Sequence, residues 1–372
     1  MGDARLARDA PAAVTIARSA CACAVAVSVV AAAHERAASV DAASQVRATR
    51  LPQNPLITVD SSPSLGDNVN GPSIVRVPAW ITNPLGRYYA YFAHHKGRFI
   101  RLAYADAIAG PWKVHEPGVL RVEESAFTRP ASDPPNDPNF YTHVASPEIS
   151  VDDSRKRIVM WFHGWWTDRQ AWPPSVAETP AWARRNGYAQ FTQSAVSTDG
   201  VRFNAQPAIT KVSYLRAFRF DGYVYGLARL GQLVRSTDPL ASFEVGPNPF
   251  AGGPYAGRVR HVALLRRGNT LFVFFTGIGD APERILVSTI DLTGSWISWK
   301  ASTPAELLRP EAPYECPDFP IVPSAPGEIE GKARQLRDPG IFEEAGKTYL
   351  FYSFCGEQGL AAAEVRLPAS QD

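Results

Sequence analysis

Acidic, basic and imidazole side chains recur at the starts of short apolar segments along the chain. The residues at these segment starts are Asn70 and Gly71, His143, Ser146 and Glu148, Tyr214 and Arg216, Arg260 and His261, and Arg337 and Asp338. Carboxylates and imidazoles transfer protons, and guanidinium groups bind carboxylates or hydroxyl groups. Packing explains such groups poorly, so they either hold a ligand or cap and bridge neighbouring segments. We predict a ligand site with six contact residues: His95, His143, Arg216, Arg260, His261 and Arg337.

Tryptophans lie in the long connections between these segments. Trp165 and Trp166 follow His163 directly, and Trp172 and Trp182 come shortly after. The flat apolar face of an indole stacks on the apolar face of a sugar ring, whereas simple loop packing is the alternative role. We therefore assign Trp165 to the same site and predict a carbohydrate ligand.

The elements that carry these residues repeat five times. Each copy has a short apolar segment, a turn, and a second segment rich in aromatic residues; the copies begin near residues 71, 146, 215, 261 and 338. Aromatic and β-branched residues bounded by turn residues are typical of a β-hairpin. A third apolar segment follows most copies, as at residues 99–104, 285–288 and 359–363.

Repeated small antiparallel sheets are typical of propeller blades. Helical periodicity is nearly absent after residue 50, so we predict an all-β, five-bladed β-propeller over residues 51–372; a two-sheet sandwich is the alternative. The first strand of each blade lines the central channel of a propeller. We therefore expect the polar residues at the five strand starts to converge at one mouth of that channel.

The overall charge argues against two classes of partner. The chain of 372 residues has 38 Lys and Arg against 36 Asp and Glu, a net charge of +2, and no block of basic residues. This excludes nucleic acid and anionic membrane as the main partner, and we expect no membrane span. The sequence does not define an oligomeric state.

The first 50 residues differ from the rest. They contain 18 alanines and none of the 18 Phe, 13 Tyr and 9 Trp. Arg5, Arg8 and Arg18 precede an apolar run over residues 20–33 that ends in three alanines, which is typical of a secretory signal. We predict a signal peptide and flexible spacer over residues 1–50 and a secreted or periplasmic protein; a transit-like segment or a misassigned start is the alternative.

Four cysteines are present, and Cys21 and Cys23 lie in the apolar run. Cys316 and Cys355 form an even pair in the body of the chain. In an exported protein they would form one disulfide, and otherwise they are two separate buried thiols. The sequence leaves both alternatives open.

Two stretches resemble the five-bladed propeller glycoside hydrolases, in particular family 43 and its relatives in families 32, 62 and 117. Residues 336–342 (Leu-Arg-Asp-Pro-Gly-Ile-Phe) and 346–353 are similar to the family's Arg-Asp-Pro strand and the strand that follows it. Residues 145–149 (Ala-Ser-Pro-Glu-Ile) resemble its Ala-Pro-Glu strand. The blade pattern covers most of residues 60–366.

The resemblance implies hydrolysis of O-glycosidic bonds in a poly- or oligosaccharide by paired carboxylates at the channel mouth. It assigns Asp338 as the best match to the family's Arg-Asp-Pro aspartate, Glu148 to the Ala-Pro-Glu strand, and Glu315, in Glu-Cys-Pro, to the general acid. The first blade opens with Asn70-Gly71-Pro72, so the aspartate expected there is absent, and Asp67 is its candidate substitute.

Two other functions compete with hydrolysis. A propeller that binds carbohydrate without catalysis is favoured by the missing aspartate. A metal-dependent polysaccharide lyase is favoured by the histidines at strand ends, although they lack a close metal-ligand spacing. We expect no cofactor, with a structural divalent cation at the channel as the one exception considered; the metal ligands, if any, are unknown.

Overall fold

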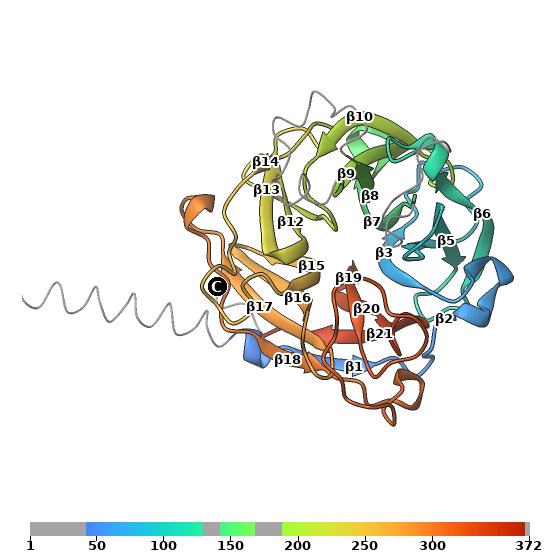
Figure 1. The fold of residues 1–372 in the computed structure, drawn as a ribbon. Coiled ribbons are helices and arrows are strands. Elements are labelled where there is room, and N and C mark those ends of the chain that lie inside the picture. The colour runs from blue at the N-terminus through green and yellow to red at the C-terminus, as the bar shows by residue number, and fades with distance from the viewer. Residues whose placement is uncertain (1–41, 129–141, 168–187, 369–372) are drawn as a thin grey trace, which may run out of the picture.

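Five antiparallel sheets surround a central axis in the computed structural model, which describes residues 42–128, 142–167 and 188–368 (Figure 1). Each sheet is one blade, and each begins at the axis with its first strand. The predicted all-β, five-bladed propeller is therefore confirmed, and the sandwich alternative is wrong. Residues 1–41, which include the predicted export signal, lie outside the described residues.

The strands follow one order in every blade, from the axis outward. Blade I contains β3 (Asn70–Arg76), β4 (Tyr88–Ala93), β5 (Phe99–Ala105) and β6 (Lys113–Arg121). Blade II contains β7 (Ala145–Asp152), β8 (Arg157–Thr167), β9 (Tyr188–Ser197) and β10 (Asn204–Thr210). Blade III contains β11 (Arg216–Phe220), β12 (Tyr223–Ala228), β13 (Gln232–Ser236) and β14 (Glu244–Val245).

Blade IV contains β15 (Val259–Arg267), β16 (Thr270–Gly277), β17 (Ile285–Asp291) and β18 (Ala305–Leu308). Blade V contains β19 (Arg337–Glu344), β20 (Lys347–Phe354) and β21 (Gly359–Arg366), with β1 (Arg47–Arg50) and β2 (Ile57–Thr58) both paired to β21. Short 3₁₀ helices connect the strands: η1 (Val59–Ser61), η2 (Pro63–Leu65), η3 (Val122–Glu124), η4 (Asp153–Arg155), η5 (Arg229–Gly231), η6 (Trp296–Ser298) and η7 (Pro313–Glu315).

The hydrophobic core lies between neighbouring blades. Tyr91 and Ile100 of blade I, for example, pack in one cluster with Met160 and Phe162 of blade II, and all four are buried. Burying such a side chain contributes about 1.5–3 kcal/mol, which explains why the second strands are rich in aromatic residues. The aromatic segments read from the sequence therefore form the contacts that hold the blades side by side.

The ring is closed by the segment before the first blade. β1 pairs with β21 from Arg47 opposite Arg366 to Arg50 opposite Ala363, so an N-terminal strand completes the last blade. The sequence predicts a flexible spacer up to residue 50, rich in Ala and Ser, whereas residues 47–50 form a paired strand. Glu315 stabilises the pairing of β1 in the last blade. Its carboxylate accepts hydrogen bonds of 2.7 Å from Nε and NH2 of Arg50 and one of 2.8 Å from Tyr352 Oη.

We expect the substitution Arg50→Ala to lower the free energy of unfolding by about 3 kcal/mol, near the lower end of the cost of breaking a buried ion pair, because Glu315 is fully buried and Arg50 is partly exposed. Urea unfolding measures this loss. Arg47→Ala is the matched control on the same strand, since among the described residues the guanidinium of Arg47 donates to the backbone carbonyls of Ser44 and Val46. Equal stability of the two variants would contradict the proposed closure.

Candidate active site at the channel mouth

Bulges at the starts of the inner strands turn side chains toward one mouth of the channel. The strand register shifts at the same point in four blades, between Asn70 and Ser73, Ala145 and Glu148, Val259 and Val262, and Arg337 and Gly340. A bulge bends the strand and re-aims the side chains next to it. The residues Ser146 and Asp338, both at a bulge and both before a proline, have positive φ values of 48° and 51°.

Asp338 and His261 form a buried pair between blades V and IV. Oδ1 of Asp338 contacts Nδ1 of His261, and Oδ2 accepts a 3.2 Å hydrogen bond from Ser353. Burial by itself raises the pKa of Asp338, but the His261 imidazole and the Arg337 guanidinium outweigh it and leave the pKa below its ordinary value. Burial lowers the pKa of His261. Asp338 is therefore a carboxylate beside a neutral imidazole at neutral pH.

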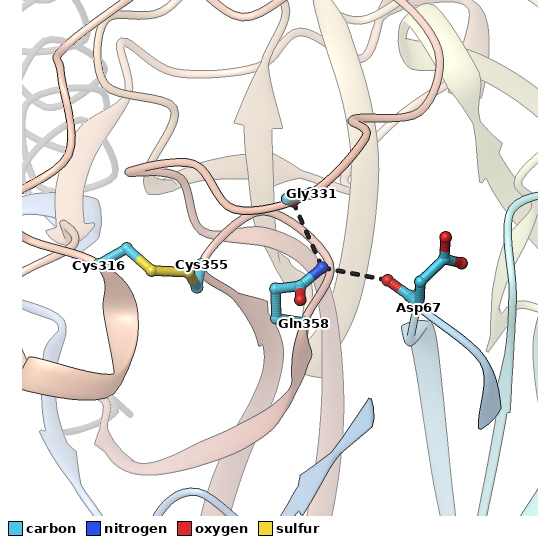
Figure 2. The surroundings of a disulfide bond; sticks show 5 residues. All are labelled: Asp67, Cys316, Gly331, Cys355 and Gln358. Atoms are coloured by element: carbon cyan, nitrogen blue, oxygen red, sulfur yellow. Dashed lines mark hydrogen bonds between the residues drawn. A yellow bond between two sulfur atoms is a disulfide. The ribbon is translucent and has the colours of Figure 1, made fainter. Parts of the chain in front are cut away.

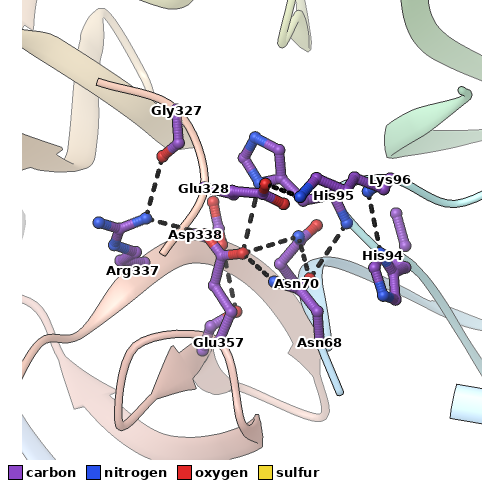
Figure 3. Close-up of polar contacts among 12 residues, drawn as sticks. Asn68, Asn70, His94, His95, Lys96, Gly327, Glu328, Arg337, Asp338 and Glu357 are labelled. Atoms are coloured by element: carbon purple, nitrogen blue, oxygen red, sulfur yellow. Dashed lines mark hydrogen bonds and ion pairs between the residues drawn. The ribbon is translucent and has the colours of Figure 1, made fainter. Parts of the chain in front are cut away.

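A second carboxylate, Glu357, lies beside the first and links blade V to blade I (Figure 3). Its Oε2 accepts hydrogen bonds from the amides of Asn68 and Asn70 and lies 3.3 Å from Nδ1 of His95. Its Oε1 accepts a 2.9 Å bond from Arg337 NH1. Burial opposes ionisation of Glu357, but His95, Arg337 and Asn68 hold its pKa well below the ordinary value.

Two buried arginines share a third carboxylate. Arg260 Nε donates to Glu283 Oε1 at 2.8 Å, and Arg337 Nε lies 3.3 Å from Glu283 Oε2. Arg337 also donates from Nε to Gln335 Oε1 at 2.9 Å. Both arginines and Glu283 are almost completely buried, so their charges must be balanced within the protein.

Residues 324–331, which we call the strap, contact these arginines through their backbone, and Gly327 and Glu328 of the strap lie close to Arg337 and Asp338 (Figure 3). The carbonyl of Gly327 accepts bonds from NH1 of Arg260 at 3.1 Å and NH1 of Arg337 at 3.2 Å, and that of Ala325 accepts one from Arg260 NH2. Glu328 forms an ion pair with Lys96 of blade I. The strap therefore joins three blades and presents Glu328, whose side chain is 21% exposed, at the mouth.

Rings of blades II, III and IV that pack against one another at tilted or edge-on angles form one wall of the mouth, next to Asp338. The His163 and Tyr214 ring centroids lie 4.0 Å apart, and those of Tyr214 and His261 lie 4.3 Å apart. His143 contacts His163 edge-on at 5.6 Å, and Trp165 packs at 6.1 Å from His143. This row of rings therefore extends from Trp165, the predicted carbohydrate-binding residue, to the pair of His261 and Asp338. Trp172 and Trp182 lie outside the described residues.

Arg216 of blade III and Glu148 of blade II form an ion pair between the inner strands. Arg216 donates to the carbonyls of Pro72, Pro147 and Val262, on the inner strands of blades I, II and IV, and its NH1 lies 2.9 Å from Glu148 Oε2. Glu148 also accepts a 3.1 Å bond from Ser73. Both side chains are thus tied to strand backbone or to each other, and the structure does not bring Glu148 into contact with Asp338.

The remaining two predicted acids lie apart from the carboxylates at the mouth. Glu315 is bound to Arg50 and Tyr352 at the outer part of blade V, as described above. Asp67 is 92% exposed, and its Oδ1 lies 2.9 Å from Nε2 of His94, which lowers the pKa of Asp67. Among the predicted residues, the mouth therefore unites Asp338, Arg337, Arg260, His261 and His95.

Gly71 occupies the place where the resemblance implies an aspartate. Its φ is +65°, and an added Cβ would lie 3.2 Å from the Ser146 Cα of the next blade. A close approach also occurs at Gly340, where a Cβ would lie 2.3 Å from the Pro72 carbonyl oxygen. Blade I therefore supplies no carboxylate at its bulge.

Cys316 and Cys355 form a disulfide, which resolves the two alternatives left by the sequence (Figure 2). Cys355 begins the turn that carries Glu357. In the same turn, Gln358 Nε2 donates to the carbonyls of Asp67 at 3.1 Å and Gly331 at 3.3 Å (Figure 2). The bridge thus fixes the turn that supplies the second carboxylate.

Glu357 and Glu283 were missed by sequence reasoning because they do not lie at the start of an inner strand, and His163 was considered only among the strand-end histidines that could bind a metal ion. Glu357 sits in a Gly-containing turn after β20, and Glu283 lies between β16 and β17. The one signal for Glu357 was the neighbouring Cys355. Within residues 42–128, 142–167 and 188–368, no group of three or more His, Cys, Asp and Glu is arranged to hold a metal ion. The same residues contain no helix able to cross a membrane.

At pH 7 we expect Glu357→Gln to lower the free energy of unfolding by about 3–5 kcal/mol, because a buried guanidinium loses its counter-charge. The folded-state pKa of Glu357 is depressed, so this stabilisation is present above the unfolded-state value near 4.5 and is lost as the pH falls below it. Urea unfolding at pH 7 and at pH 3–4 should show the difference between variant and wild type shrinking in acid.

The partly exposed Glu364, paired with Lys347 at 3.2 Å, provides the control variant Glu364→Gln. Its effect should be small at every pH. A Glu357→Gln deficit that stays constant between pH 7 and pH 3 would contradict the depressed pKa.

Comparison with other proteins shows one similar sequence and many similar folds. The uncharacterized protein R118 of Acanthamoeba polyphaga mimivirus is 35% identical over 341 residues, which cover 86% of this chain and 90% of R118. No protein-family model matches the chain.

Solved structures of glycoside hydrolases share the fold. A glycosyl hydrolase from Bacteroides ovatus has a TM-score of 0.55 at 11% identity, covering 87% of this chain and 94% of that one. A structure from the GH130 family, described as mannoside phosphorylases and hydrolases of β-1,2 mannosidic linkages, has a TM-score of 0.54 at 13% identity and covers 87% and 95%. CoXyl43, a GH43 β-xylosidase/α-arabinofuranosidase from a compost metagenome, has a TM-score of 0.52 at 13% identity and covers 86% and 94%. The chain thus has the five-bladed propeller fold of glycoside hydrolases in a divergent sequence.

Proposed function

The chain belongs to the same protein family as the mimivirus protein R118, and we propose that it hydrolyses O-glycosidic bonds of a poly- or oligosaccharide at the channel mouth. The observation that carries this proposal is the buried Asp338, held as a carboxylate beside His261 at the mouth of a propeller. The glycoside hydrolases that share the fold support the same reaction class.

Asp338 is the carboxylate that activates water or attacks the anomeric carbon. Ionisation is required for either role, and His261 and Arg337 favour the ionised form. The carboxylate is 2% exposed and lies beside Arg337, which the strap covers through Gly327. Entry of a sugar therefore requires the strap to move.

Glu328 is the second carboxylate and acts as the general acid. Hydrolysis needs one acid that protonates the leaving oxygen, and this group must exchange protons with solvent. Glu328 is partly exposed on the strap, whereas Glu357 and Glu283 are fully buried with fixed partners.

Carbohydrate binding without hydrolysis is the second candidate function. Gly71 favours it, because blade I lacks the carboxylate that the family resemblance implies and its φ and close neighbour leave little room for one. The two functions differ in turnover: a binding protein forms a stable complex with a glycan and releases no reducing sugar. Export remains a proposal that rests on residues 1–33 alone.

We expect Asp338→Asn to reduce the rate of reducing-sugar release by about 10²–10⁴-fold, because the amide cannot act as a base or nucleophile. The rate is measured on a panel of arabinan, xylan and β-1,2-mannan, with protein folding checked by circular dichroism. Hydrolysis at the wild-type rate by the variant would remove Asp338 from the mechanism. Binding by wild type without any release of sugar would favour the second candidate.

We expect Glu328→Gln to slow hydrolysis of an unactivated oligosaccharide by about 10²-fold or more, but to slow an aryl glycoside with an acidic leaving group much less. Departure of such a group needs little protonation. Glu330→Gln is the matched control, since Glu330 also pairs with Lys96, at 3.4 Å, but is 85% exposed. An equal loss on both substrates would exclude a general-acid role for Glu328.

A further inference from the structure

His163 has a buried imidazole that the proposed reaction does not use. Its side chain is almost completely buried, at 1% exposure. Neither Nδ1 nor Nε2 has a hydrogen-bond partner among the residues that the structure describes. Buried polar groups in native proteins are nearly always paired, and an unpaired one is costly.

The ring lies in the wall of the mouth. His163 is opposite Ala145 in the register of β7 and β8, next to the bulge at Ser146. Its ring packs against Tyr214 with the planes tilted by 34°, and Tyr214 packs against His261 at 45°; His261 in turn contacts Asp338. The unpaired nitrogens therefore sit two rings away from the proposed catalytic carboxylate.

The other histidines of this group differ from His163. Nδ1 of His261 contacts Asp338, and Nδ1 of His95 lies 3.3 Å from Glu357. Each of these rings has a carboxylate that orients it. No carboxylate in the described residues forms an ion pair with His163, so its position is set by ring packing against Tyr214 and His143 rather than by a charge.

The protonation state of His163 defines the ligand that it can accept. Burial lowers its pKa well below the usual value, and nearby His143, His95 and His261 lower it further. A neutral imidazole has one N–H donor and one acceptor nitrogen. Hydroxyl groups satisfy both, whereas a carboxylate offers only acceptors and an ammonium group offers only donors.

We propose that His163 binds hydroxyl groups of a glycosyl unit seated beside Asp338, so that this position takes a neutral sugar in preference to a uronic acid that presents its carboxylate to the ring. This inference rests on the proposed function for the placement of the sugar. At 1% exposure, the ring meets the sugar only once neighbouring residues have moved, just as the strap must move before a sugar reaches Asp338.

The substitution His163→Phe tests the proposal because it removes both nitrogens and keeps a ring for stacking on Tyr214. We expect a urea unfolding midpoint at or above the wild-type value, since an unpaired polar group is replaced by an apolar one. We also expect the Kd for neutral glycans to rise by about 10- to 100-fold, the effect of losing two neutral hydrogen bonds. Calorimetry with xylotriose, arabinotriose, β-1,2-mannobiose and trigalacturonic acid measures binding.

His115→Phe, on the outer strand β6, is the control and should bind like wild type. Wild-type preference for trigalacturonic acid, or equal Kd values for wild type and His163→Phe, would overturn the proposal, as would binding of no probe by the wild type. A second outcome is that His163→Phe binds neutral glycans more weakly but the wild type does not hydrolyse them. This outcome would overturn the proposed hydrolysis and leave the role of His163 intact. If the wild type hydrolyses glycans and His163→Phe binds them with an unchanged Kd, the role of His163 is overturned and the proposed hydrolysis stands.

Discussion

The guanidinium of Arg337 is the interaction on which the mouth depends. It is 1% exposed, and a charge so deeply buried is tolerated only with compensating partners. Those partners come from different parts of the chain: Glu283 between two strands of blade IV, Glu357 in a turn of blade V, and the Gly327 carbonyl of the strap. Satisfying one buried cation thus fixes two blades and the strap relative to one another.

The same constraint organises the electrostatics of the site. Arg337 precedes Asp338 in the chain and favours its ionised form, while His261 contacts Asp338 from blade IV. Glu357, on the other side of Arg337, extends the network to His95 and to Asn68 and Asn70 of blade I. The result is a set of carboxylates with fixed protonation states below a partly exposed Glu328. The hydrolysis proposed above needs one ionised carboxylate and a second one that donates a proton.

The fold could be read from the sequence because its cause is local. Alternating turns and aromatic segments, such as residues 261–275, form a hairpin whose second strand packs between blades. The starts of the inner strands also converged as predicted for Arg260, His261, Arg337 and Asp338. What could not be read depends on contacts between distant residues. Glu357 meets Asn68 across 289 positions, and Glu315 resembles a general acid in sequence but meets Arg50 of a strand with no aromatic residue.

The most direct test is a crystal structure of the Asp338→Asn variant with a bound neutral oligosaccharide, drawn from glycans that the wild type binds. The account predicts an anomeric carbon within hydrogen-bonding or van der Waals reach of residue 338, the strap displaced from Arg260 and Arg337, and a sugar hydroxyl on His163. An oligosaccharide bound on the outer loops, with the strap still tied to both arginines, would contradict it.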